Sequence, residues 1–144
     1  MSIFSTSSLG KWEHEYKMLL NGVKTPLVHE STWMLGDIPS LVAIFDVEEV
    51  VYITYTLNLA STLRSFHKEG MVNEFRTHVA VFECGLSPKT AEERYSNGRS
   101  ARRVDLAVGR MTFSIAAAPE KRLNALVNAF VVVADPRYNG PTAI

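Results

Sequence analysis

The sequence predicts an α+β domain in which antiparallel strands come first and a helix comes last. From Tyr52 on, residues 51–59 alternate between polar and apolar side chains, which is typical of a strand with one buried face. The period changes to that of a helix only after Pro119, where apolar residues recur at spacings of three and four. These residues are Leu123, Leu126, Val127 and Phe130. This order differs from the alternating strands and helices of a Rossmann-type fold.

Composition indicates a globular protein of ordinary size. The chain has 144 residues, of which 47% are hydrophobic and 21% charged, and we predict a single domain over residues 1–144. Within it we expect a hairpin in 1–30, a sheet in 31–117 and a helical end in 118–144. Fifteen Lys and Arg residues balance fifteen Asp and Glu residues, so the formal net charge is zero. Bulk charge alone therefore cannot hold nucleic acid, and any polyanion site must be a local patch.

Cysteine content and hydropathy exclude several classes of protein. Cys84 is the only cysteine, so no intramolecular disulfide forms, and it and the four histidines offer no zinc spacing. The first residues lack the basic stretch and apolar stretch of a secretory signal. The apolar runs, such as 129–134, are too short to span a bilayer. We expect a soluble protein, made inside the cell, that uses no metal and no cofactor.

The amino-terminal segment predicts a β-hairpin. Asn21-Gly22 separates two runs that contain apolar residues, 16–20 and 23–28. This dipeptide favours a type I′ turn, because both central residues of that turn need positive φ. Pro26 has no N–H to donate, so the hairpin should lie at a sheet edge or over a surface.

Further strands extend the sheet to five. Residues 75–84 and 104–116 are predicted as strands, and the stretch between them, 85–103, is predicted as a long exposed loop rich in Ser, Gly, Pro and charge. The helix should end before Asp135-Pro136, because a residue that precedes proline disfavours the α region. One helix cannot easily cover the apolar face of so large a sheet. We therefore expect a second copy of the chain to cover it.

No enzymatic activity is predicted, because the common catalytic motifs are missing from the sequence. It contains no glycine-rich phosphate loop, no G-x-S-x-G and no H-E-x-x-H. Glu48-Glu49 and Glu92-Glu93 are pairs of adjacent acids, which on a strand point to opposite faces and in a loop are usually solvated.

Alternation also predicts a polar face shared by three strands. Its members are Thr54, Thr56, Asn58, Arg76, His78, Arg110, Thr112 and Ser114. Such a surface suits RNA, because arginines neutralise phosphates while Thr, Ser and Asn can bond to bases or 2′-hydroxyls. The alternative is the ordinary solvated face of an antiparallel sheet, which is commonly rich in Thr and Arg.

A cluster of basic residues lies in the predicted loop, partly offset by Glu92 and Glu93. The basic residues are Lys89, Arg94, Arg99, Arg102 and Arg103. They indicate either a solvated loop or a loop that contacts neighbouring subunits or nucleic acid.

The order of these parts resembles the coat proteins of single-stranded RNA bacteriophages, the levivirus type. The resemblance covers nearly the whole chain and consists of short local similarities. These are the stretches YKMLLNGVKTPLVH, VYITYTLNLAS, NEFRTHVAVFE, VDLAVGRMTFSIA, PEKRLNALVNAF and DPRYNGPTAI.

The resemblance implies a structural capsid protein that forms interlocked dimers. In such dimers two sheets join, the helices of each chain pack on the partner's sheet, and the dimers assemble into an icosahedral shell. The inner sheet face would bind the genomic RNA, including a hairpin that represses translation. The implied RNA-facing residues are Thr54, Thr56, Asn58, Arg76, His78, Val108 and Arg110. The loop 88–102 would form contacts between dimers.

The partners implied are therefore the chain itself and a single-stranded RNA genome, with no membrane and no small-molecule substrate. The implied location is the virion, after synthesis and assembly in the cytoplasm of a bacterial host. Two other hypotheses stay open. One is a viral RNA-binding or matrix-like protein without a closed shell, and the other is an α+β domain that binds a small ligand in a pocket.

Overall fold

The computed structural model describes residues 6–33, 35–68, 73–85, 87, 89 and 98–139. Its elements are η1 (Thr6–Trp12), α1 (Glu13–Leu20), β1 (Thr25–Pro26), α2 (His29–Thr32), β2 (Ser40–Asp46), β3 (Glu49–Thr56), α3 (Leu59–His67), α4 (Glu74–Cys84), α6 (Gly98–Gly109), β4 (Met111–Ala117) and α7 (Glu120–Ala134). The prediction of an α+β protein with an antiparallel sheet is confirmed.

The sheet has four strands in the order β1-β4-β2-β3, and each neighbouring pair is antiparallel. β2 is a central strand, and its Ala43 lies opposite Ile53 of β3 and Ser114 of β4. Residues 40–45 of β2 are all buried, because both faces of this strand are covered. Pro26 lies in β1 at the edge of the sheet, as its missing N–H predicts.

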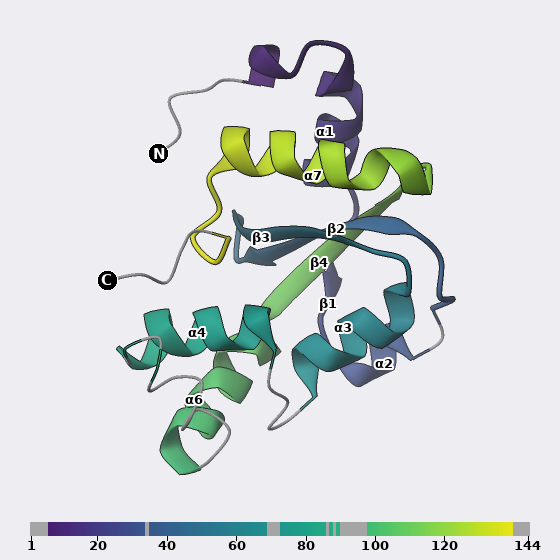
Figure 1. Cartoon of the computed structure of the whole chain (residues 1–144). Coiled ribbons are helices and arrows are strands. Elements are labelled where there is room, and N and C mark those ends of the chain that lie inside the picture. The colour runs from purple at the N-terminus through teal and green to yellow at the C-terminus, as the bar shows by residue number, and fades with distance from the viewer. Residues whose placement is uncertain are drawn as a thin grey trace.

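Helices from the chain itself cover both faces of the sheet. Figure 1 shows α1 and α7 on one face and α2, α3, α4 and α6 on the other. On the first face Leu41, Ala43 and Phe45 of β2 belong to a core with α7 residues such as Phe130. On the second face the alternate β2 residues, such as Ile44, belong to a core with α3, α4 and α6. The result is a sheet between two helical layers.

This arrangement overturns the argument that one chain leaves an apolar face of its sheet uncovered. The chain was expected to place its helix on a partner's sheet because a single helix left one face uncovered. Instead α7 packs on its own sheet, and four further helices cover the opposite face. The apolar sheet therefore gives no reason to require a second copy.

The carboxyl-terminal helix agrees with its sequence signals. α7 runs from Glu120 to Ala134 with Pro119 at its amino-terminal cap. It ends where Asp135 takes the left-handed conformation (φ 50°) before Pro136. Its apolar stripe faces the sheet, as the spacing of three and four predicts.

The predicted amino-terminal hairpin is not present. Residues 13–20 form α1, and Asn21 follows this helix, where its N–H donates to the Lys17 carbonyl (2.9 Å). Only Thr25–Pro26 of the predicted second strand pairs in the sheet. Leu19 of α1 is fully buried. Packing of this helix on the sheet therefore overrides the turn propensity of Asn21-Gly22.

The strand predicted over residues 75–84 is instead the helix α4. Phe75 and Val79 would share one face of a strand, and because they are four residues apart they also share a helix face. The helix has clear end signals. The Asn73 side chain accepts a hydrogen bond from the Arg76 N–H (2.9 Å), and Gly85 takes the left-handed conformation at the other end (φ 66°).

The third long strand is shorter than predicted. Residues 104–109 belong to α6, with Val104, Ala107 and Val108 buried at helical spacing, and β4 begins only at Met111. The predicted loop 85–103 lies partly outside the described residues, and its last part, 98–103, is the start of α6.

No helix in the described part of the chain combines the length and apolar character needed to cross a membrane.

Candidate nucleic-acid interface

The six residues predicted to bind RNA do not lie on one sheet face. Thr54 and Thr56 are on β3, and Asn58 is at the cap of α3. Thr56 is buried, with its Oγ1 2.6 Å from Thr62 Oγ1 and accepting a hydrogen bond from the Asn58 N–H (2.9 Å). This threonine therefore closes the turn from β3 into α3.

Arg76 and His78 are on α4 and are buried. The Arg76 guanidinium donates to the Phe66 carbonyl (2.9 Å) and forms an ion pair with Asp105 of α6. His78 Nδ1 bonds to the Tyr138 carbonyl. In the strand expected here both side chains would have faced solvent, whereas in the helix they link α4 to neighbouring segments.

Arg110 is half exposed but is already neutralised by carboxylates. Its Nε and an Nη each lie 3.1 Å from an oxygen of Asp46, and the same Nη lies 3.2 Å from Glu83. Arg137 also contacts Asp46 (2.9 Å). We call these four residues the carboxylate cluster. The hydrogen bond from Arg110 is the main reason that the pKa of Asp46 is lowered, and it raises the pKa of Arg110.

The carboxylate cluster predicts a pH-dependent contribution to stability. An Asp46 pKa held below its usual 3.8 stabilises the folded state above that pH, and the contribution is lost as pH falls through the folded-state pKa. Asp46→Asn should lower the free energy of unfolding at neutral pH by about 2 kcal/mol, and the difference from the wild type should shrink at about pH 3. Urea unfolding of both proteins at the two pH values measures this. A difference that stays constant would contradict a charged role for Asp46.

The exposed face of α6 carries three arginines that have no acidic partner in the described part of the chain. Arg99, Arg102 and Arg103 are exposed, and within the described residues none of them forms an ion pair. The opposite face of the helix is buried through Val104 and Ala107. All three arginines were predicted as part of a basic loop. The helix instead holds them at spacings of three and four on one rigid face.

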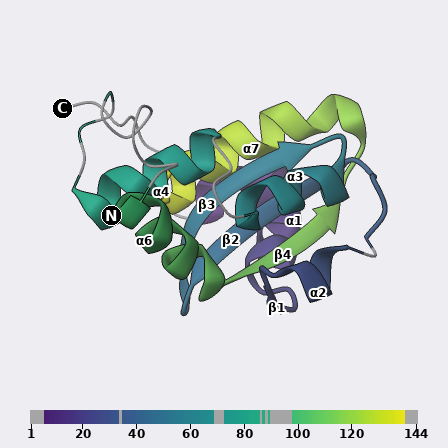
Figure 2. The same ribbon diagram turned by 90° about the horizontal axis from the view of Figure 1, so that it is seen from below.

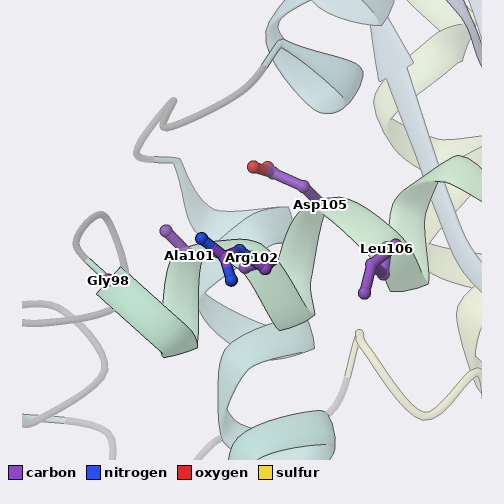
Figure 3. Close-up of a pocket in the computed structure, with 5 residues that line it drawn as sticks. All are labelled: Gly98, Ala101, Arg102, Asp105 and Leu106. Carbon is purple, nitrogen blue, oxygen red and sulfur yellow. The ribbon is translucent and has the colours of Figure 1, made fainter.

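A hollow of about 400 Å³ lies beside these arginines. It is lined by Gly98, Ala101, Arg102, Asp105 and Leu106. Figure 3 shows that all five residues lie along α6. The lining of the hollow therefore combines a cation (Arg102), a carboxylate (Asp105) and an apolar side chain (Leu106). Leu106 is 69% exposed. Next to the arginines, the hollow therefore offers an exposed apolar side chain as well as charged groups.

Two more cations lie on the neighbouring helix. The buried residues of α3 include Leu63 and Phe66, and its outward positions carry Arg64, with Lys68 just after the helix. Both are exposed, and neither forms an ion pair in the described part of the chain. The sequence analysis gave them no role, because it predicted no helix between the strands at 51–59 and 75–84. The apolar residues 59, 63 and 66 recur at helical spacing, which indicates a helix. In a helix, Arg64 and Lys68 are four residues apart and therefore lie on the same face.

We call these five side chains the cationic surface. It consists of Arg64, Lys68, Arg99, Arg102 and Arg103. Figure 2 shows α6, α3 and α2 over the same face of the sheet, and α3 contacts both of the others. Among described residues of the helices in this layer, the exposed acids are Glu30 and Glu74. Counted over the described residues, this layer therefore has a local excess of positive charge, whereas the whole chain has zero net charge.

Other kinds of site have less support in the described part of the chain. No group of three or more His, Cys, Asp or Glu side chains there could hold a metal ion. A second hollow, of about 340 Å³, lies next to β1 and β4. The described residues that line it are Val23, Thr25, Ser31, Leu35, Phe113, Ser114 and Ile115. These offer hydroxyls but no charged group, and Ser114 Oγ already donates to the Leu19 carbonyl (2.5 Å).

The chain matches no protein-family model, no curated protein and no solved structure. Its function is therefore inferred from the residues described above.

Proposed function

We propose that this protein binds RNA through the cationic surface and acts as a structural protein that coats RNA. The observation that carries the proposal is the exposed face of α6, where Arg99, Arg102 and Arg103 have no acidic partner among the described residues. The predicted sheet-face residues Arg76 and Arg110 are not used, because their guanidinium groups already bond to carboxylates.

The physical basis is the contrast between paired and unpaired arginines. A guanidinium that pairs with a carboxylate has little charge to offer a phosphate, and opening the pair costs free energy. No carboxylate among the described residues pairs with the α6 arginines, and the planar guanidinium fork matches two oxygens of one phosphate. A rigid helix presents them in fixed positions. On a chain of balanced charge, such a local patch of cations attracts a polyanion.

The coat role extends this proposal from binding to assembly. It draws on the resemblance to levivirus-type coat proteins in the sequence. It also draws on exposed apolar side chains that could contact another copy, among them Leu106 beside the arginines and Val23 beside β1. Interlocking of helices is not part of the proposal, because the chain covers its own sheet.

Two measurements on the protein of residues 1–144 test the proposal. Fluorescence anisotropy of a labelled single-stranded RNA should show binding that weakens as salt increases. No binding at about 50 mM salt would refute the RNA-binding role. Electron microscopy of the purified protein with RNA should show particles that protect RNA from nuclease. A monomer that binds RNA without particles would refute the coat role and favour an RNA-binding protein without a shell.

A further inference from the structure

Trp33 is a large aromatic side chain on the surface of the layer that carries the cationic surface. It directly follows α2, and its exposed fraction is 54%. The His29 ring, four residues earlier, is stacked with it, with ring centroids 6.4 Å apart and an interplanar angle of 16°. The other tryptophan, Trp12, packs against the core on the opposite side of the sheet. A half-exposed indole is costly to leave in water and is therefore a candidate contact surface.

The short helix that presents Trp33 is held in place from below. The Trp33 N–H donates to the His29 carbonyl (3.1 Å). Thr32 is buried, and its Oγ1 lies 2.7 Å from Nε2 of His67 on α3. Burial lowers the pKa of His67, which favours the neutral ring at this contact. The indole is thus an anchored platform rather than a side chain on a loose loop.

The platform and the cationic surface belong to one layer. α2 packs on α3, and α3 packs on α6, so Arg64 and Lys68 lie on the helix between Trp33 and the α6 arginines (Figure 2). Proteins that bind single-stranded nucleic acid combine these two elements: cations along the backbone and aromatic rings on which bases stack. Bases of a duplex are already stacked in pairs and offer no free face to an indole.

We infer that the RNA bound by this protein is single-stranded, and that one of its bases stacks on Trp33 while the phosphates contact the cationic surface. This inference rests on the proposed function and adds the residue through which the protein would select a single strand over a duplex. Glu30 is exposed on α2 itself, but the neighbouring α3 and α6 contribute the five cations of the cationic surface, and this excess favours a nucleotide over an apolar protein segment as the occupant of Trp33.

The test uses full-length Trp12→Phe protein, in which Trp33 alone reports by fluorescence. Single-stranded RNA should quench this fluorescence, and a duplex of the same length should quench it far less. Trp33→Ala should weaken binding of the single strand roughly 10-fold or more, whereas Trp33→Phe should retain most of the affinity. The position is exposed, so both variants should keep the far-ultraviolet circular dichroism of the wild type.

The outcomes separate this inference from the proposed function. Salt-dependent binding with no quenching and an unchanged affinity in Trp33→Ala would overturn the stacking role and leave RNA binding intact. Equal affinities for single strand and duplex would overturn the single-strand preference. No RNA binding by the wild type would refute the proposed function itself, and the surface around Trp33 would then belong to a protein partner.

Discussion

Replacing Arg99, Arg102 and Arg103 by glutamine is expected to lower the affinity for single-stranded RNA by roughly 10²–10³-fold at about 50 mM salt. Counterion release makes log Kobs fall by about 0.7 per phosphate contact for each tenfold rise in salt. At about 50 mM, roughly 1.3 decades below 1 M, three lost contacts amount to about 2.7 logarithmic units. Anisotropy titrations of both proteins with the same RNA measure the difference.

A matched control keeps the change in net charge and moves it to the other helical layer. Lys11, Lys17 and Lys121 lie on η1, α1 and α7, away from the cationic surface. Lys17 pairs with Glu13 in an exposed ion pair, which contributes little to stability. Replacing these three lysines by glutamine should change the affinity far less than the arginine substitutions do. Equal losses in the two triple variants would mean that net charge alone governs binding.

Arg76→Met should lower the free energy of unfolding by about 3 kcal/mol, at the lower end of the cost of breaking a buried ion pair. The Arg76 side chain is fully buried, and it holds Asp105 of α6 and the carbonyl of Phe66 at the end of α3. Removing it leaves both acceptors without this donor. Asp105 is one-quarter exposed and can recruit some water, which limits the loss. Chemical denaturation at neutral pH measures the difference.

The double variant Arg76→Met/Asp105→Leu distinguishes loss of the ion pair from loss of packing. Replacing both partners by apolar residues removes the unpaired charge, so the double variant should regain part of the lost stability. A loss below about 1 kcal/mol in Arg76→Met would contradict a structural role for the pair. α6 also carries arginines of the cationic surface, so the RNA affinity of Arg76→Met should be measured together with its free energy of unfolding.

Local signals in the sequence predicted the ends of the chain's last helix and the edge position of Pro26. The apolar residues of α7 recur at helical spacing, and Pro136 marks its end, so both signals predict the same helix. The strand predicted over 51–59 corresponds to β3, which ends at Thr56, and its predicted last residue, Leu59, instead begins α3. The failure at α4 has a specific cause. Positions 75 and 79 fit both a strand face and a helix face, and the deciding signals were Asn73 and Gly85 at the two ends.

The candidate site was predicted only in its residue types. Arg99, Arg102 and Arg103 were identified as basic and able to contact RNA, but their common face depends on α6, which the loop-like composition before Val104 concealed. The common sheet face predicted for the RNA-binding set was wrong, because Arg76 and His78 were assigned to a strand and lie on the helix α4. Whether a guanidinium is exposed or paired depends on residues far away in the chain, such as Asp105 for Arg76. No local pattern contains that information.

The most direct test of RNA binding by the cationic surface is the slope of log Kobs against log salt concentration for a single-stranded RNA. The wild-type slope should be steeper than that of the Arg99/Arg102/Arg103→Gln variant by about 2, since each of three contacts contributes about 0.7. The lysine control on the opposite layer should keep the wild-type slope. Identical slopes for the wild type and the arginine variant would show that these arginines do not contact phosphates, and would contradict the account.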